Sequence, residues 1–300
     1  MHKQKTLGDS ARCSGIGVHS GRSINLTIRP APPNHGIKFI RTDLRNAPSI
    51  PALFKMVTDT SLATVLGQEG VIVSTIEHLM AAFSGMGVDN ALVEMDAYEL
   101  PIMDGSARPF VEMIQRAGIV EQPAQRCFFI IREPVELSDG DKFVGIYPDT
   151  AFRVECTIAY DNPVIGEQTC RVTVTPAAFA EEISRARTFG FYHEYQMLKQ
   201  HGLARGGSLD NTLVIDGEAL MNEGGLRYDN EFVRHKVMDC IGDLSLLGMP
   251  LRGRLVARKS GHLFNHQLLQ KIFREKQCWK TGFLDPAADE ERASLKSLAF

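Results

Sequence analysis

One order of elements is expected twice along this chain, and it constrains the fold more than any other feature of the sequence. Each half is predicted to end with a histidine-bearing helix, a turn that begins Gly-Met, a strand and a second helix. In the first half these elements are residues 77–84, 85–87, 90–95 and 107–118. In the second half they are residues 231–248, 248–250, 251–261 and 264–276. Although the halves share little sequence identity, this order predicts an α+β fold of two related modules, each a sheet covered on one face by two helices.

The earlier part of each half is predicted to form strands. Period-two alternation predicts strands at 23–30 and 35–44, and the first helix is expected to begin behind Ser74 or Thr75. In the second half, the predicted strands precede a long insertion and comprise residues 127–137, 142–148 and 152–160.

A Pro-containing polar run at 121–124 predicts the boundary between the modules. We therefore expect an N-terminal domain over 1–122 and a C-terminal domain over 123–300. If the two domains pack helix face to helix face, their histidine-bearing helices lie side by side. A functional site at this seam is then expected.

Composition excludes several classes of protein. A chain of 300 residues with 44% hydrophobic content can bury a large core. It has neither a secretory signal nor a run of about 18 apolar residues, which predicts a cytoplasmic location and no transmembrane segment. The net charge of −3 argues against a dedicated nucleic-acid binder. Six scattered cysteines without a CxxC pair are expected to be reduced and structural.

Three polar residues recur on the helix that begins at Glu231. His235, Asp239 and Asp243 are four residues apart and therefore share one helix face. Such a stripe also fits a face exposed to water, so its spacing alone leaves both interpretations open.

The other predicted histidine-bearing helix favours a metal site. A catalytic zinc takes three protein ligands of the His, Asp or Glu type and keeps one open position, which His78, His235 and Asp239 would satisfy. Glu77 would then act as general base. His262 follows Ser260-Gly261 in an expected loop, where it could donate a proton, with Asp243 holding it protonated. Taken separately, Glu77-His78 also fits a solvated helix start, and His262 a structural loop residue.

Several motifs together resemble one family, the UDP-3-O-acyl-N-acetylglucosamine deacetylases of lipid A synthesis. The matching segments are SGIGVHSG at 14–21, STIEHLMAAFSGMGVDN at 74–90, LPIMDGSARPFV at 100–111, SRARTFGF at 184–191, GLRYDNEFVRHKVMDCIGDL at 225–244 and KSGHLFNHQLL at 259–269. The resemblance implies two β-α-α-β domains and a zinc amidase that converts UDP-3-O-[(R)-3-hydroxyacyl]-N-acetylglucosamine to the free glucosamine derivative plus acetate. This is the committed step of lipid A, and hence lipopolysaccharide, biosynthesis in a Gram-negative bacterium.

The resemblance also assigns roles to individual residues. It implies the same zinc ligands and Glu77 as base, His262 as general acid or electrostatic partner, and Asp243 as the charge that orients His262. It adds Thr188 as the hydroxyl that stabilises the oxyanion. The His₂Asp donor set also accepts Fe²⁺, so the metal in the cell stays open.

Substrate contacts are implied by the resemblance as well. The hexosamine would lie against Phe189 beside Lys236, with the diphosphate near Lys142 and the uracil stacked on Tyr160. An insertion near 195–216 would form a passage for the acyl chain. Residues implied to line this passage are Val18, Met197, Gly207 and Ser208. His19 is implied near the site or is part of a loop.

Three positions depart from the family pattern. Val18 stands where leucine is usual, Asn162 where histidine is usual, and Glu194 where aspartate is usual. These departures put the shape of the passage and the nucleotide contacts in doubt, but not the zinc ligands. For the PIMDGSA motif at 101–107 we expect a structural role, with Asp104 and Gly105 shaping a turn.

Two other functions stay open from the sequence alone. One is a zinc amidohydrolase or peptidase with another substrate, and the other is a binding module without catalysis. The sequence leaves the preferred acyl length undetermined, and a monomer with at most peripheral membrane contact is expected. The tail DEERASLKSLAF at 289–300 fits either a degradation tag or a frayed end.

Overall fold

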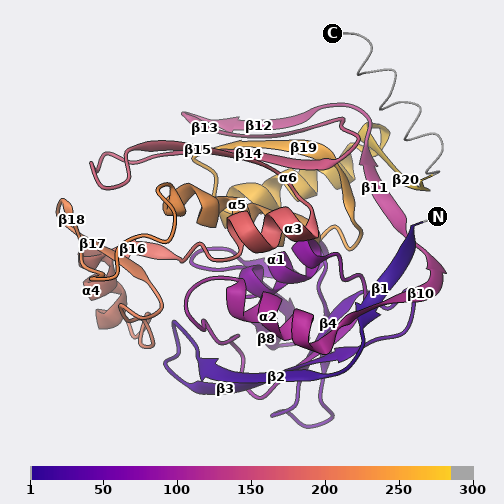
Figure 1. Ribbon diagram of the computed structural model, residues 1–300, viewed down its shortest axis with the longest axis horizontal. Coiled ribbons are helices and arrows are strands. Elements are labelled where there is room, and N and C mark those ends of the chain that lie inside the picture. The colour runs from indigo at the N-terminus through magenta and orange to yellow at the C-terminus, as the bar shows by residue number, and fades with distance from the viewer. Residues whose placement is uncertain (1, 285–300) are drawn as a thin grey trace.

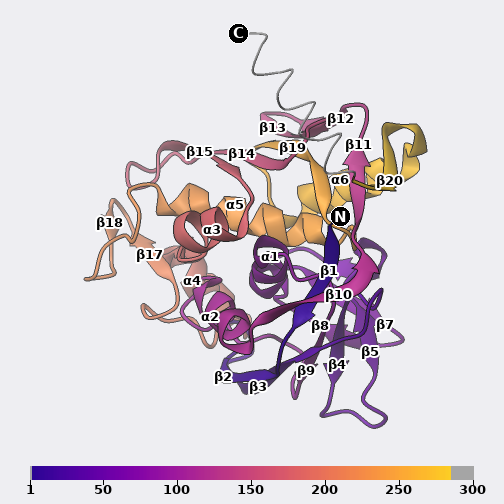
Figure 2. The same cartoon turned by 45° about the vertical axis from the view of Figure 1, so that its right-hand side comes forward.

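The computed structural model describes residues 2–284, and in this part of the chain all helices except α4 lie between two larger sheets (Figure 1). A view turned by 45° shows the same layers (Figure 2). The helices are α1 (Glu77–Met86), α2 (Arg108–Ala117), α3 (Pro176–Ala178), α4 (Tyr192–Gln200), α5 (Glu231–Ser245) and α6 (His262–Arg274). A π-helical turn at Phe179–Ile183 follows α3, and 3₁₀ turns occupy Phe54–Met56 and Lys276–Cys278.

The sheet of the first half has five strands in the order β2-β3-β9-β4-β5. They are β2 (Ala11–Ile16), β3 (Ser23–Pro30), β9 (Ala91–Met95), β4 (Ile37–Arg41) and β5 (Ser49–Pro51). A smaller three-stranded sheet follows β5 in the chain and leads into α1. Its strands are β6 (Val57–Asp59), β7 (Val65–Gln68) and β8 (Val71–Val73).

The sheet of the second half has seven strands, with β19 (Leu251–Arg258) at its centre. The start of β19 pairs with β11, and the rest lies between β13 and β14. The other strands are β11 (Cys127–Ile131), β12 (Val135–Asp139), β13 (Lys142–Tyr147), β14 (Phe152–Ala159), β15 (Glu167–Thr173) and β20 (Trp279–Phe283).

The two sheets repeat one topology. In the first, β9 runs antiparallel to β3 and parallel to β4, and in the second, β19 runs antiparallel to β13 and parallel to β14. The central strand is preceded by α1 or α5 and followed by α2 or α6. The element order predicted from the sequence is therefore present in both halves of the structure. The two halves also share the same strand pairing, which the sequence did not reveal.

Helices α1 and α5 pack against each other at the centre of the molecule. A Cβ atom at Gly242 would lie 2.2 Å from the main-chain oxygen of Glu77, so only glycine allows this approach. One apolar face of α5 is fully covered, and its residues Val233, Val237, Ile241 and Leu244 are at most 1% exposed. This burial holds the start of α1 against the middle of α5.

Residues 121–124, expected as the break between the modules, belong to β10 (Ile119–Gln125), which pairs with β1 (Lys3–Leu7). Pro123 lies where the register shifts, so its missing N–H interrupts no regular ladder bond. The Gln122 side chain is buried and donates to the carbonyl of Ala31 at 2.8 Å. The polar composition of residues 121–124 suggested a break between the modules, whereas hydrogen bonds to β1 make this segment a strand. The domain boundary itself stays a prediction.

Other boundaries differ by a few residues. Helix α1 begins after Ile76 without a side-chain cap, and the expected strand 127–137 is interrupted between β11 and β12. His262 is the first residue of α6, so its expected position in a loop is wrong. Gly261 adopts an extended conformation and ends the loop one residue earlier.

The long insertion carries a β-α-β unit that extends from one end of the molecule (Figure 1). Strand β16 (Phe189–Phe191) runs parallel to β17 (Leu213–Asp216), with α4 between them in the chain, and β18 (Ala219–Leu220) completes the small sheet. This unit begins earlier than the segment 195–216 expected from the sequence.

Within residues 2–284, no helix is both long and apolar enough to cross a membrane. All six cysteines are free thiols, and four of them are buried. The tail at 289–300 lies outside the described residues.

Candidate active site

Three side chains with metal-binding chemistry meet where α1 crosses α5. The Nε2 atom of His78 lies 3.9 Å from Oδ1 of Asp239, and Nε2 of His235 lies 3.4 Å from the same oxygen. One potential ligand atom from each residue lies within 4.8 Å of the others. All three residues are at most 4% exposed, so the alternative of a water-facing stripe is wrong.

The protonation states of these groups suit a divalent cation. Burial, with His235 nearby, lowers the pKa of His78 to about 3, and burial also lowers the pKa of His235. Although burial opposes its charge, His235 and Lys236 hold the pKa of Asp239 well below its usual range. At neutral pH the group is two neutral imidazoles and a carboxylate, the donor set that binds zinc.

Hydrogen bonding leaves the ligand atoms available. His235 contacts the carbonyl of Ala186 through Nδ1 at 3.1 Å, which orients the ring with Nε2 toward Asp239. Nζ of Lys236 donates to Oδ2 of Asp239 at 2.9 Å. Oδ1 of Asp239 is buried and has no hydrogen-bond partner among the described residues. Such an orphaned acceptor fits a bound cation.

Two titratable groups of opposite character border the three candidate ligands. Burial raises the pKa of Glu77 to about 7, where a carboxyl group can exchange protons at neutral pH. Burial and the helix N-terminus oppose a positive charge on His262. The Asp243 carboxylate, 2.9 Å from Nδ1, nevertheless raises the pKa of His262 to about 10. A base and a cationic acid therefore coexist in one site.

Asp243 is held by two residues that sequence reasoning missed. Asn265 donates to its Oδ2 at 2.8 Å, and the hydroxyl of Thr64 donates to its Oδ1 at 2.6 Å. Both partners are buried. Thr64 precedes a short strand of the first half, and no motif or spacing connects it to the second half. Asn265 is four positions from Gly261 in a matched motif, but its side chain carries no recognisable signal.

Two cavities meet at this cluster. One, of about 450 Å³, is lined by the metal-site residues, by His262 and by the lysines at 142, 236 and 259. The other, of about 390 Å³, is walled largely by apolar residues of the β-α-β unit. Both are lined by Leu62, Glu77, His78, Thr188 and Phe189. A polar group and an apolar chain of one ligand could thus occupy separate spaces next to the same reactive groups.

Most residues expected at the substrate line one of these cavities. Lys142 and Lys236 line the polar one, and the apolar one is lined by Val18, His19, Gly207 and Ser208. Nζ of Lys236 lies 5.6 Å from the centre of the Phe189 ring. Tyr160 lines neither cavity, although its ring lies 5.8 Å from that of Phe189. Met197 also lines neither and is 53% exposed on α4.

The three departures from the family pattern lie beside the β-α-β unit or in the apolar cavity. Asn162 donates to the carbonyl of Gly217 at 2.8 Å and accepts from the main chain of Val164, so it stabilises a turn beside the β-α-β unit. Glu194 lines the apolar cavity from α4, as Val18 does from the loop after β2.

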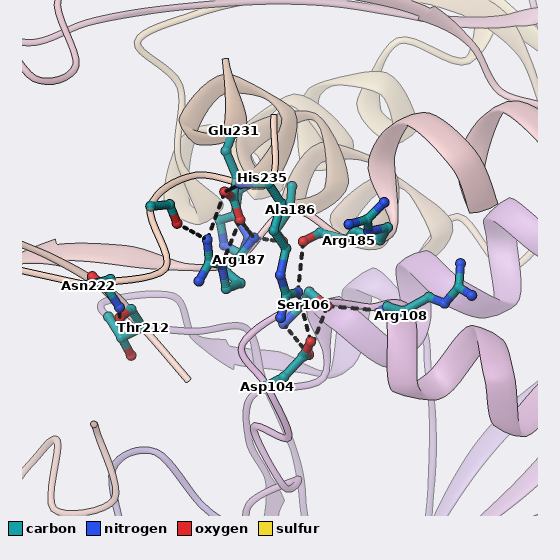
Figure 3. Close-up of polar contacts among 12 residues, drawn as sticks. Asp104, Ser106, Arg108, Arg185, Ala186, Arg187, Thr212, Asn222, Glu231 and His235 are labelled. Carbon is teal, nitrogen blue, oxygen red and sulfur yellow. Dashed lines mark hydrogen bonds and ion pairs between the residues drawn. The ribbon is translucent and has the colours of Figure 1, made fainter. Parts of the chain in front are cut away.

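A buried ion pair fixes the segment that carries Thr188. Figure 3 shows Arg187 directed at Glu231, with Ala186 and His235 beside them. Glu231 is 0% exposed and accepts from both the main chain and the guanidinium of Arg187 at 2.9 and 2.8 Å. This pair anchors residues 186–188 to the start of α5. It thereby also fixes the carbonyl of Ala186, which contacts His235.

The expected turn in the PIMDGSA motif is present and supports the same segment. The main chain of Gly105 donates to the carbonyl of Ile102, and Asp104 pairs with Arg227 at 2.8 Å. Gly105 has φ of +82°, and a Cβ there would lie 1.9 Å from the carbonyl oxygen of Asn211. Its own carbonyl accepts from the main chain of Thr188 at 2.8 Å. The motif is therefore structural support for Thr188.

Buried His₂Asp ligands beside a carboxyl base and a cationic imidazole define a class, the mononuclear metal-dependent hydrolases. Comparisons with known proteins specify the family. The family model described as "UDP-3-O-acyl N-acetylglycosamine deacetylase" matches residues 4–274.

Curated relatives carry the corresponding name. A UDP-3-O-acyl-N-acetylglucosamine deacetylase of Myxococcus xanthus is 52% identical over 279 residues, which cover 93% of this chain and 89% of the relative. Those of Teredinibacter turnerae and Syntrophotalea carbinolica are 48% and 47% identical, with 98% and 100% of this chain and 97% of each relative covered. This chain belongs to the UDP-3-O-acyl-N-acetylglucosamine deacetylase family.

Proposed function

We propose that this chain removes the N-acetyl group from UDP-3-O-[(R)-3-hydroxyacyl]-N-acetylglucosamine in lipid A biosynthesis, releasing acetate and a free amine. The observation that carries the proposal is the meeting of a polar and an apolar cavity at the residues Glu77, His78, Thr188 and Phe189. A ligand with a charged nucleotide and a fatty chain needs both spaces. Membership of the family supplies the identity of the amide.

We propose Zn²⁺ as the metal held by His78, His235 and Asp239, whose burial and donor atoms fit it. When bound, the ion polarises the amide carbonyl and favours ionisation of the attacking water. Because His₂Asp also accepts Fe²⁺, metal analysis of the protein isolated from its native cell decides between the two.

The two proton-transfer groups act in sequence. Glu77, whose pKa lies near neutrality, takes the proton from water as its oxygen bonds to the carbonyl carbon. The Thr188 hydroxyl would donate to the oxyanion, and His262 would supply positive charge and a proton to the leaving nitrogen. The C–N bond then breaks, leaving acetate and the amine. Asp243 keeps His262 protonated before the step.

Substrate binding follows the division of the cavities. The hexosamine would pack on Phe189 beside Lys236, and the diphosphate would approach Lys142, in the polar cavity. The uracil would stack on Tyr160. The acyl chain would enter the apolar cavity past Val18, His19, Gly207 and Ser208. We assign no contact to Met197, because its side chain is exposed outside that cavity.

The repeated sheet topology supports a division into two related β-α-α-β domains, with the active site between their helices. A cytoplasmic location, a monomeric state and the absence of a nucleic-acid partner stay predictions from the sequence.

The test is acetate release from the acylated UDP-sugar, compared with N-acetylated peptides, by protein loaded with about one equivalent of zinc. We expect turnover of the sugar only, and a large loss on Glu77→Ala. Turnover of the peptides alone would make the chain an amidase of another class. A protein that binds no metal, with Glu77→Ala indistinguishable from wild type, would indicate a binding module.

A further inference from the structure

Thr64 connects the two proton-transfer groups across the seam between the halves. It precedes β7, is 2% exposed and comes from the first half of the chain. Its main-chain N–H donates to Oε2 of Glu77 at 3.0 Å, and its hydroxyl donates to Oδ1 of Asp243 at 2.6 Å. The same hydroxyl lies 3.4 Å from Nδ1 of His262. One residue thus contacts the base and the carboxylate that charges the acid.

We propose that Thr64 is a positioning residue that fixes the Asp243–His262 pair relative to Glu77. The proposal rests on the proposed function, in which these groups transfer protons. Thr64 does not touch the reacting atoms in this proposal and acts through its two carboxylate partners.

The hydrogen bonds around Asp243 explain why one hydroxyl matters. Oδ2 of Asp243 accepts from both His262 and Asn265, at 2.9 and 2.8 Å. Oδ1 accepts from Thr64, the one donor of these three that comes from the first half. With both oxygens held, the carboxylate plane is fixed, and so is the direction in which Nε2 of His262 points. Without the hydroxyl, the carboxylate can rotate, and a buried charge loses a partner.

The main-chain N–H of Thr64 connects it to Glu77 as well as to Asp243. Because the N–H and the hydroxyl belong to one residue, Thr64 bridges the carboxylates of Glu77 and Asp243. A hydroxyl deletion preserves the N–H contact with Glu77, so it separates the effect on the acid from any effect on the base.

An ordinary structural role predicts a different outcome. Buried threonines commonly satisfy their hydroxyls on nearby acceptors, and their loss then lowers stability alone. Thr6 offers a matched control, because it is also buried and its hydroxyl donates to the carbonyl of Asn90 at 2.7 Å, away from the site. Thr6→Val is expected to lower the melting temperature without changing kcat.

The first experiment measures kcat, KM, zinc content and thermal unfolding for wild type, Thr64→Val, Thr64→Ser and Thr6→Val. Acetate release by wild type is established first, so a failure of the proposed function is seen separately. We expect Thr64→Val to lower kcat by about tenfold or more, the loss typical of a hydrogen bond to a buried charge, with KM and zinc content nearly unchanged. Thr64→Ser keeps the hydroxyl and should stay within about threefold of wild type.

Coupling to Asp243 is the decisive measurement. In an Asp243→Ala background, where the hydroxyl has lost its acceptor, Thr64→Val should cost less than about twofold in kcat. Equal losses in both backgrounds would overturn the proposal, as would a folded Thr64→Val enzyme with wild-type kcat. If Thr64→Val does not fold, Thr64→Ala replaces it in the same cycle. A folded Thr64→Ser enzyme that loses more than about tenfold also contradicts the proposal.

Discussion

The two halves of the chain share a sheet topology and a pair of helices, but they contribute different chemistry. In the first half, the first turn of α1 supplies the proposed base Glu77 and one proposed ligand, His78. In the second half, α5 supplies two proposed ligands and Asp243, and α6 supplies His262. Neither half alone holds the three proposed ligands together with both proposed proton-transfer groups. The comparison shows that the site forms because the repeated fold brings different residues from the two halves together where α1 crosses α5.

The largest effect is expected from removing the ligand that both imidazoles face. Asp239→Ala should abolish zinc binding and lower kcat/KM by at least about a thousandfold, because the several kcal/mol that the ion supplies are lost. Zinc content by elemental analysis checks the first part and acetate release the second. Asp229→Ala, an exposed residue just before α5, is the control and should retain metal and activity. Full zinc occupancy in Asp239→Ala would contradict the assignment of this ligand.

The approach of the halves can be tested at Gly242. Its Cβ would lie 2.2 Å from the main chain of Glu77, so Gly242→Ala should displace the start of α1 and lower kcat by about a hundredfold. Gly85→Ala is the matched control, since its Cβ would lie 2.2 Å from the Phe179 ring but away from the site. We expect both variants to melt at lower temperature and only Gly242→Ala to lose kcat. Equal activity of the two variants would show that the helix crossing does not determine catalysis.

The periodicity of α5 is the reason that much of the site could be predicted. Four-residue spacing placed His235, Asp239 and Asp243 on one face, and the repeat indicated that His78 would face them. Thr64 could not be found, because its hydrogen bond to Asp243 joins residues 179 positions apart. Such a contact depends on how the two halves pack together, and Gly242 allows α5 to approach the main chain of Glu77.

In the fold as well, elements with a clear local sequence pattern could be predicted, whereas those that depend on tertiary contacts could not. Helices α2 and α5 and strands β3 and β14 lie close to their predicted positions, because each has a clear apolar period. Strand β10 was missed, because the composition of residues 121–124 is that of a loop and only pairing with β1 makes it a strand. The insertion that carries the β-α-β unit was expected from family resemblance, since its glycine-rich sequence has no strong period.

The second half contributes a positively charged histidine, His262, to the site, whereas the first half does not. The pH dependence of activity can report the pKa of His262. Asp243→Asn removes the anion that raises the pKa of His262 to about 10, so that pKa must fall. Because the acid is active only below its pKa, the alkaline limb of the kcat/KM profile should move to lower pH by more than about one unit. At pH 7 we expect a loss of about ten- to a hundredfold. An alkaline limb that does not move would assign it to another group.

The smallest effect is expected in the apolar cavity, which residues of both halves line. Gly207 and Val18 line it from opposite halves of the chain, and a larger side chain at 207 would enter the space proposed for the acyl chain. Gly207→Leu should raise KM about tenfold for long-chain substrates and less for short ones, because a few buried methylenes are lost at roughly 0.8 kcal/mol each. Met197→Ala, on the exposed face of α4, is the control and should leave KM unchanged. KM is measured against acyl length for both variants. The proposed passage requires that the change in KM depend on acyl length for Gly207→Leu and not for Met197→Ala. A KM increase that is equal for all chain lengths would place the acyl chain elsewhere and leave the polar cavity as the whole of the binding site.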